Sequence, residues 1–247
     1  KYFETGDFVL ADSYLSVIEA LKYSAYATGR HPILTWMNAL DFENNPKKLQ
    51  NLKDFDGVLI PGGFGSRGVE GKLKVIEYVR KNKIPYFGIC YGMQLMVIEY
   101  ARNVLKLKDA NTREVDPKSK NLVVDVMESQ KENIEKGKYG GTMRLGAYDA
   151  KLRKGTIAYE SYGQENISER HRHRFEVNNQ YVESLENAGF VFSGKSPNGD
   201  LCEIAELPKK DHPFFLAVQF HPEFLARPLR PHPLFTSFIQ ASIKNQK

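Results

Sequence analysis

Apolar residues in the first half of the chain recur at spacings typical of alternating strands and helices. Apolar positions that return every three or four residues predict helices at residues 14–25, 69–79 and 92–105. Ser13 is placed to cap the first of these helices and Gly29 to end it. Short apolar runs predict strands at residues 33–37, 56–60 and 84–90. Because strands and helices alternate with short connections, the order predicts a parallel sheet covered by helices.

The second half of the chain has a different pattern, in which strands dominate. Short apolar runs predict strands at residues 122–127, 141–145, 190–194, 201–207 and 214–220. Apolar spacing predicts helices around residues 181–185 and 234–239, and the polar stretch 130–138 predicts a loop. We therefore expect one α/β domain over residues 1–247. Its mostly parallel central sheet is flanked by helices, with additional β elements in the second half.

Cys90 lies at the junction between a predicted strand and the helix that follows at once. Glycines stand on both sides of it, at Gly88 and Gly92, and they permit strained backbone angles and close approach of a substrate. The same strand–turn–helix geometry exposes the nucleophilic serine of many hydrolases. A thiol at a helix N-terminus loses its proton more readily, and the thiolate is the nucleophile. A lone cysteine is more often buried packing, but this setting favours a catalytic role.

The glycine-rich stretch 61–65 follows the preceding predicted strand. It matches neither a dinucleotide-binding fingerprint nor a phosphate-binding P-loop, because Ser66 occupies the position five residues before Gly71 where a P-loop requires glycine. Its bare backbone N–H groups can stabilise an oxyanion, and the N–H of Tyr91 is a second donor. Ligands bind beyond the carboxyl ends of parallel strands, so Gly62, Gly63 and Cys90 can share a pocket. A simple tight turn is the alternative interpretation.

His221 and Glu223 end a predicted strand and supply the groups that a cysteine nucleophile needs. His221 can take the thiol proton and return it to a leaving amine, and Glu223 can accept from the imidazole and fix its tautomer. Two residues apart on an extended backbone, the two side chains point the same way. Of the 6 histidines, we single out His221 because it combines a strand end, a proline and a carboxylate at this spacing.

The cationic run 169–174 has two interpretations that its composition leaves open. It can be an exposed basic loop that meets phosphate or RNA, or it can supply a guanidinium that holds a substrate carboxylate. Aromatic interleaving is slight, which argues against a nucleic-acid partner. Cys202 lies within a predicted strand and is interpreted as packing. No His, Cys and Asp cluster has metal-ligand spacing, so we predict no metal site.

Composition narrows the class of protein. The chain has 247 residues, 41% of them hydrophobic, with a net charge of +5 from interleaved charges that indicate a solvated surface. It has no run of roughly 18 apolar residues, so we expect no membrane span. With 2 cysteines and no signal peptide, we expect a reducing, cytoplasmic setting.

Several stretches of the chain resemble the class I (triad) glutamine amidotransferases, and most closely the glutaminase domain of CTP synthase. These stretches are residues 61–71, 85–94, 99–104, 140–146, 169–178 and 219–224. The elbow around Cys90 and the His221-x-Glu223 pair are shared by the class, whereas stretches 140–146 and 170–174 are typical of CTP synthase. The resemblance covers nearly all of the chain and implies the flavodoxin-like fold of the class.

The resemblance implies a glutaminase with a catalytic triad of Cys90, His221 and Glu223. Cys90 attacks the side-chain amide of L-glutamine to form a γ-glutamyl thioester, with backbone N–H groups of Gly63 and Tyr91 in the oxyanion hole. The implied glutamine-binding residues are Gly63, Tyr91, Gly92, Met93, Gln94, Glu114 and Arg174. Among them, Glu114 matches the family's acidic residue for the substrate amino group, and Arg174 matches the residue on the α-carboxylate side.

The resemblance also implies a larger enzyme. Ammonia would pass through a tunnel to an N-terminal synthetase domain, absent from this chain, which uses ATP and Mg²⁺ to aminate UTP to CTP. GTP would act as allosteric activator, the full-length enzyme would be a homo-oligomer (a tetramer), and this domain would hold no cofactor. The family has a further strand before the segment matching Lys1, so we expect a truncation there. Tyr91 stands where the family usually has leucine, and Arg113 where it often has threonine. We expect Tyr91 to alter the wall of the pocket.

Two other functions are compatible with the same motifs. A related cysteine hydrolase, such as a γ-glutamyl peptidase, would keep Cys90 and His221 but would need no partner domain or tunnel. An inert regulatory or nucleotide-binding module would use the basic run alone, and its binding would fall steeply with salt. The complete set of Cys90, His221 and Glu223 argues against the inert module.

Overall fold

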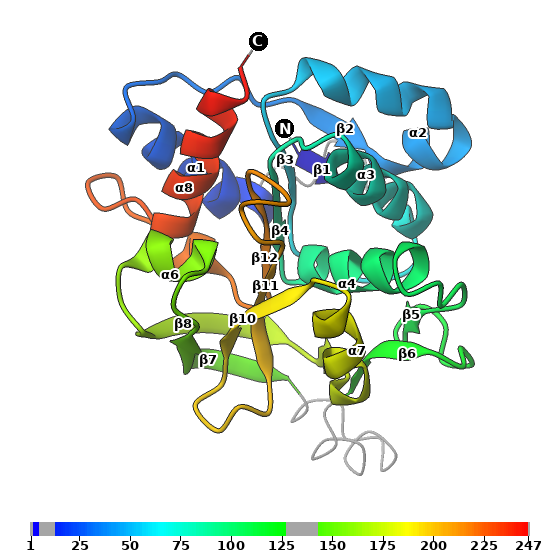
Figure 1. The fold of residues 1–247 in the computed structure, drawn as a ribbon. Helices are drawn as coiled ribbons and strands as arrows, with labels where there is room; N and C mark the ends of the chain where they lie inside the picture. The colour runs from blue at the N-terminus through cyan, green and yellow to red at the C-terminus, as the bar shows by residue number, and fades with distance from the viewer. Residues whose placement is uncertain (1, 5–12, 127–142, 247) are drawn as a thin grey trace.

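The computed structural model describes residues 2–4, 13–126 and 143–246, which build two β-sheets and the helices around them (Figure 1). The larger sheet has nine strands in the order β2-β1-β3-β4-β12-β11-β10-β7-β8, and the smaller has three in the order β5-β6-β9. In the described part of the chain, no helix is long and apolar enough to span a membrane.

One half of the large sheet is parallel. Its strands are β2 (Trp36–Asn38), β1 (Tyr2–Glu4), β3 (Val58–Ile60), β4 (Tyr86–Ile89) and β12 (Phe215–Val218). The residues of β3, β4 and β12 are all buried, because helices cover both faces of a parallel sheet and each strand is a continuous apolar run. β1 runs between β2 and β3, so residues at the start of the chain themselves supply a central strand.

Helices cover the two faces of this parallel half, and each face has its own apolar core. On one face lie α1 (Leu15–Ala27) and α8 (Pro233–Lys244), and on the other α3 (Val69–Lys81) and α4 (Tyr91–Asn103) (Figure 1). Phe87, Phe235 and Phe238 pack edge-on or tilted in the first core. Alternate residues of β4 point to opposite faces, so Tyr86 belongs to the second core.

The other half of the large sheet is antiparallel. It consists of β11 (Cys202–Glu206), β10 (Val191–Lys195), β7 (Arg144–Leu152) and β8 (Asn166–His173). The smaller sheet consists of β5 (Asn111–Thr112), β6 (Leu122–Val126) and β9 (Phe175–Val177). The remaining helical segments are α2 (Ala39–Asn44), α6 (Ile157–Tyr162), α7 (Val182–Asn187) and 3-10 turns at Pro46–Asp54, Asn179–Tyr181 and Pro222–Phe224. Of the additional β elements predicted for the second half, those at β7, β10 and β11 extend the central sheet, whereas the one at β6 belongs to the smaller sheet.

Several predicted boundaries are wrong in detail. Helix α1 begins after Tyr14 without a side-chain cap, so Ser13 is not its N-cap. The strand predicted at 33–37 is shortened to Trp36–Asn38, and Ile33 is exposed. Residues 39–44 and 46–54, for which no element was predicted, are helical. The predicted loop 130–138 lies outside the described residues, as does the start of the strand predicted at 141–145.

The cationic run 169–174 is the largest surprise, because residues 169–173 belong to strand β8 and not to a loop. Its side chains alternate: Arg170 and Arg172 are exposed, whereas Glu169, His171 and His173 are buried. Residues 169–173 of the run pair with β7, from Tyr148 opposite Glu169 to Arg144 opposite His173. Half of the run therefore belongs to the protein interior, and a basic surface loop is excluded.

Candidate active site

Cys90 occupies a sharp turn between strand β4 and helix α4. Its backbone has a positive φ of 49° with ψ of −99°, a conformation that costs an L-residue about 1–3 kcal/mol and persists only where the surroundings hold it. Three hydrogen bonds do so: Cys90 N donates to Val218 O at 2.7 Å, and Cys90 O accepts from Met93 N and Gln94 N. The turn points the thiol out of the strand at the N-terminus of α4.

The glycines on either side of Cys90 serve close packing and are not themselves strained. A Cβ on Gly92 would stand 2.4 Å from Ile60 O, and one on Gly88 would stand 2.8 Å from the Cβ of Ala217. Neither glycine has a positive φ, so the expectation that they adopt the strained angles is wrong: Cys90 does. They let helix α4 begin directly against the end of β3, which brings Cys90 beside the glycine-rich stretch.

His221 and Glu223 form a pair directly after strand β12. His221 Nδ1 lies 2.7 Å from Glu223 Oε1, and the ring stacks on Phe224 with centroids 5.1 Å apart. The backbone between them is a 3-10 turn, Pro222–Phe224, and not the extended segment that was expected. His221 N also donates to Arg170 O at 2.7 Å, which ties this turn to strand β8.

The hydrogen bond at Nδ1 leaves the other ring nitrogen of His221 available for chemistry. Nε2 is buried and has no hydrogen-bond partner among the described residues. Burial lowers the pKa of His221, but the negative charges of Glu223 and Cys90 outweigh it and raise this pKa to about 10. The arrangement therefore favours a protonated imidazole beside the sulfur of Cys90.

A cavity of about 800 Å³ opens over the thiol. It gathers most of the predicted site residues from distant parts of the chain, namely Gly63, Cys90, Gln94, Glu114, Arg174, His221 and Glu223. Gly62 lines it as well, so the prediction that the glycine-rich stretch shares a pocket with Cys90 is confirmed. Tyr91, Gly92 and Met93 do not line it; they form the first turn of α4, where Met93 N already donates to Cys90 O.

Tyr91 packs beneath the glycine-rich stretch and does not form a wall of the cavity. Its hydroxyl donates to Gly65 O at 2.5 Å, and the ring lies under the ammonium group of Lys72, 5.2 Å from the centroid. Burial raises the pKa of Tyr91 well above its usual range, with a further contribution from the charge of Glu114. The expectation of an altered pocket wall is wrong, because the tyrosine instead anchors the stretch that carries Gly63.

Opposite charges meet in the cavity at Glu114 and Arg174. Glu114 Oε1 accepts from Gly65 N at 2.9 Å. Burial raises the pKa of Glu114, while the Gly65 N–H and the charge of Arg174 act to lower it. Arg174 Nε is buried and has no partner among the described residues. The neighbouring Arg113, a departure from the family pattern, forms an ion pair with Asp125 on strand β6.

Two glutamine side chains lie behind the thiol. Gln94 Nε2 donates to Phe175 O at 3.1 Å and to Gln219 Oε1 at 3.5 Å. Gln219 Nε2 in turn donates to Cys90 Sγ at 3.8 Å. Gln219 was missed from the sequence, although its position two residues before His221 puts both side chains on one side of an extended backbone.

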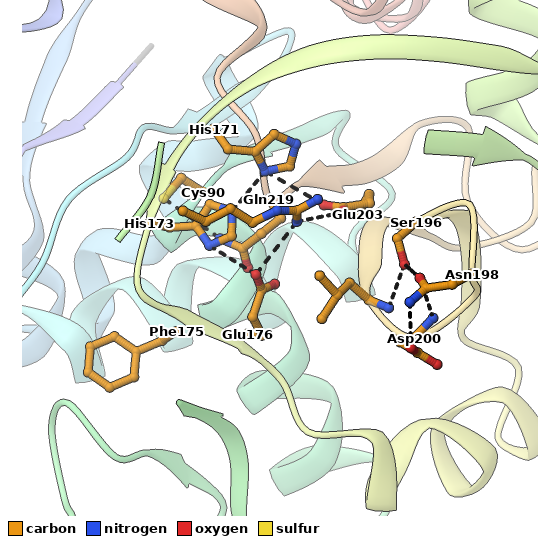
Figure 2. A network of polar contacts seen from close by, with 12 residues as sticks. Cys90, His171, His173, Phe175, Glu176, Ser196, Asn198, Asp200, Glu203 and Gln219 are labelled. Atoms are coloured by element: carbon orange, nitrogen blue, oxygen red, sulfur yellow. Dashed lines mark hydrogen bonds and ion pairs between the residues drawn. The ribbon is translucent and has the colours of Figure 1, made fainter. Parts of the chain in front are cut away.

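A buried polar network joins the antiparallel half of the sheet to the wall of the cavity (Figure 2). Arg144 Nη1 donates to Glu203 Oε1 at 2.6 Å, and His171 Nδ1 lies 2.8 Å from His173 Nε2. Burial and the charge of Arg144 lower the pKa of His171 to about 3, and the same causes lower that of His173 well below its usual range. These imidazoles are neutral interior groups. His173 also lines the cavity, and Figure 2 places it on the same side as Gln219 and Cys90.

The second cysteine behaves as packing. Cys202 is 1% exposed within strand β11, and burial raises its pKa to about 12. The thiol therefore stays protonated at neutral pH. Cys90 and Cys202 are both free, as expected for a chain without a disulfide framework.

Comparison with known proteins gives a consistent result. The family model "Glutamine amidotransferase class-I" matches residues 9–241. The chain is 51% identical to the CTP synthase of Geobacillus kaustophilus over 95% of its length, and 53% identical to that of Carboxydothermus hydrogenoformans over 96%. It spans only 43% of each of those proteins.

Solved structures agree with the sequence matches. The glutaminase domain of Trypanosoma brucei CTP synthase, with bound acivicin, superposes with a TM-score of 0.92 at 35% identity, covering 100% of this chain and 94% of that one. A glutamine amidotransferase from Thermotoga maritima shares the fold with a TM-score of 0.51 at 11% identity, covering 98% of this chain and 95% of that one.

Proposed function

Because this chain belongs to the class I glutamine amidotransferase family, and within it to the glutaminase domains of CTP synthase, we propose that it hydrolyses L-glutamine to glutamate and ammonia. The observation that carries the proposal is the position of Cys90. A strained turn aims its thiol into a cavity of about 800 Å³, beside a histidine whose second nitrogen is held by a carboxylate. This is the arrangement of a nucleophile, a general base and an orienting acid.

In the first half of the reaction, Cys90 Sγ attacks the side-chain carbonyl carbon of glutamine. The negative charge that develops on the carbonyl oxygen is stabilised by the backbone N–H groups of Gly63 and Tyr91. His221 Nε2 holds the proton taken from the thiol and gives it to the amide nitrogen, so the C–N bond breaks and ammonia leaves. A γ-glutamyl thioester on Cys90 remains, and His221 is neutral.

In the second half, water hydrolyses the thioester. His221 Nε2 takes a proton from the water, whose oxygen attacks the thioester carbon, and the same backbone N–H groups receive the oxyanion. Collapse breaks the C–S bond, so glutamate leaves and the thiolate is restored beside an imidazolium. Glu223 keeps its hydrogen bond to Nδ1 throughout, which holds the tautomer that leaves Nε2 free.

The charges of the cavity fit the backbone end of glutamine. The Glu114 carboxylate is the proposed partner of the α-ammonium group, and the Arg174 guanidinium that of the α-carboxylate. Gln94 is proposed to line the side-chain end, and Gly92 and Met93 to support it from the first turn of α4. Support comes from the lining of one cavity by Glu114, Arg174 and Gln94 around the thiol.

The wider reaction is proposed from the relatives. We propose that this chain works with a synthetase domain of the same polypeptide, in the cytoplasm and in a homo-oligomer. The released ammonia would aminate UTP to CTP there with ATP and Mg²⁺, and GTP would stimulate the glutaminase. That this chain spans 43% of the length of its CTP synthase relatives supports a partner domain.

The test is labelling with the electrophilic glutamine analogue diazo-oxo-norleucine, followed by intact-mass measurement and peptide mapping. One adduct on Cys90, prevented by excess glutamine and absent from Cys90→Ala, is the expected result. Cys202 is the internal control, because its buried and protonated thiol should stay unlabelled. The labelling is run with and without added synthetase domain, and absence of the Cys90 adduct in both overturns the proposal.

A parallel assay of free ammonia separates the glutaminase from a peptidase. Release of ammonia from glutamine, with no cleavage of γ-glutamyl peptides, is expected. Peptide cleavage without ammonia release would instead identify a γ-glutamyl peptidase that uses the same Cys90 and His221.

A further inference from the structure

We propose that Gln219 is a catalytic residue, whose side-chain amide donates a hydrogen bond to the Cys90 thiolate. The inference rests on the proposed function in one respect only: Cys90 is taken as the nucleophile. Gln219 Nε2 lies 3.8 Å from Cys90 Sγ, within the range of an N–H···S hydrogen bond, and Gln219 is 0% exposed. Figure 2 shows the two side chains facing each other.

The backbone of Gln219 is held in place from strand β11. Gln219 N donates to Glu203 O at 2.8 Å, directly after the paired residues of β11 and β12. His221 follows two positions later. The same short segment therefore places two hydrogen-bond donors near Cys90 Sγ, the amide of Gln219 and the imidazole of His221.

The orientation of the Gln219 amide is set by its neighbour. Gln94 Nε2, which can only donate, faces Gln219 Oε1 at 3.5 Å and Phe175 O at 3.1 Å. The oxygen of Gln219 must therefore point toward Gln94, and its nitrogen is left toward Cys90. A reversed amide would set two donors against each other and present an oxygen to the thiolate.

A neutral donor at this position adds to the effect of His221 on the sulfur. Hydrogen bonds to the charged form of a group favour that form, and they are stronger in a buried site of low dielectric. His221 carries a proton when the thiolate attacks and again when the thioester C–S bond breaks, and in between it gives one to ammonia and takes one from water. Gln219 has no proton to transfer, so its hydrogen bond stabilises the sulfur anion at both stages without a change of its own charge.

Other charged groups also act on the thiolate, and the test must separate their effects from that of Gln219. The titratable and charged residues that share the cavity with Cys90 are Tyr14, Arg67, Glu114, Arg172, His173, Arg174, His221 and Glu223. A substitution at Gln219 changes no charge among them. A shift in the midpoint of Cys90 alkylation against pH is then due to the lost hydrogen bond and not to a change in the surrounding charges.

The experiment measures the rate of Cys90 alkylation by iodoacetamide against pH, by peptide mass, in the chain and in Gln219→Met. Methionine has a similar volume and no amide donor. Loss of one hydrogen bond to an anion should raise the titration midpoint by about 0.5–1 pH unit, so alkylation below the midpoint slows roughly three- to tenfold. Gln240→Met, the same exchange at an exposed position of α8, should leave the midpoint unchanged.

A midpoint within roughly 0.2 pH unit of the unsubstituted chain overturns the inference. Circular dichroism and an unlabelled Cys202 check that Gln219→Met is folded. If Gln219→Met does not fold, the same midpoint is measured in Gln219→Asn, whose side chain is one methylene shorter and places the amide farther from Cys90. No step uses glutamine, so the two proposals fail separately. A shifted midpoint in a chain that never releases ammonia would overturn the glutaminase alone.

Discussion

Gly62→Ala tests whether the position of the His221 ring limits the reaction. A Cβ at residue 62 would stand 2.8 Å from His221 Cε1, whereas ordinary van der Waals contact begins at 3.4 Å. Gly62 has no positive φ, so alanine strains no backbone there. The substitution therefore adds one methyl group against the imidazole and leaves the rest of the turn unaltered.

The expected loss follows from that overlap. The ring must move by about 0.6 Å to reach ordinary contact, and its 2.7 Å hydrogen bond to Glu223 resists a simple slide. The ring then tilts, and Nε2 loses its alignment with the sulfur. Misplacement of a reacting group by roughly 1 Å costs about 10²-fold in rate, so we expect kcat for glutamine hydrolysis to fall about 10- to 100-fold.

The assay is glutamate release at saturating glutamine, with the melting temperature as a check on folding. Gly63→Ala is the matched comparison, because a Cβ there meets only Tyr91 Cδ1 at 3.7 Å, an ordinary contact. Its loss should be several-fold smaller. A kcat for Gly62→Ala within twofold of the unsubstituted chain would refute the reasoning, and equal losses in both variants would refute the steric cause.

Further variants probe single groups of the site and its support. His221→Ala should lower kcat about 10²- to 10⁴-fold and Glu223→Gln less, since the carboxylate only orients the ring; equal losses would contradict this division. Because the pKa of His221 is raised to about 10, protonation of this residue stabilises the fold fully below pH 6.5, and the stabilisation is lost as pH rises toward 10. In Glu223→Gln, the melting temperature should lose most of this dependence on pH. Tyr91→Phe removes the hydroxyl that holds Gly65 O and should reduce kcat/KM roughly fivefold without slowing alkylation of the nucleophile by iodoacetamide. Lys72→Met should raise the melting temperature at pH 7 by about 5 °C, because burial lowers the pKa of this lysine to about 8. The gain in melting temperature should shrink between pH 8 and pH 10.5. An unchanged melting temperature at pH 7 would contradict this prediction.

Local periodicity was sufficient for the parts of the fold that carry the nucleophile. Strands β3 and β4 are continuous apolar runs, helix α3 has one apolar face, and helix α4 is buried on all sides over residues 91–101, so the order of apolar residues predicts these elements. Because a helix connects each strand to the next, neighbouring strands are parallel and their carboxyl ends lie at the same edge of the sheet. The meeting of the glycine-rich stretch with Cys90 could therefore be predicted. The catalytic roles of Cys90, His221 and Glu223 stay predictions.

In the antiparallel half of the sheet, apolar runs predicted strands β10 and β11, but strand β8 could not be foreseen in the same way. Strand β8 alternates charged residues on both of its faces, so no apolar period marks it. The buried charges are stabilised by partners on other strands, as Arg144 of β7 is by Glu203 of β11. A pattern of hydrophobic positions contains no information about such pairs, because a charged residue considered without its partner is predicted to be exposed.

The sequence by itself determined which residues can do chemistry, through their type and their place at the ends of strands. Only the tertiary structure decided which of them touch. Gln219 reaches Cys90 across 129 positions of chain because β12 pairs with β4 in one register, and Tyr91 turns its hydroxyl to Gly65 and not into the cavity. Periodicity indicates which apolar side chains are buried, whereas the partner of a polar side chain depends on which distant strands pair and in which register.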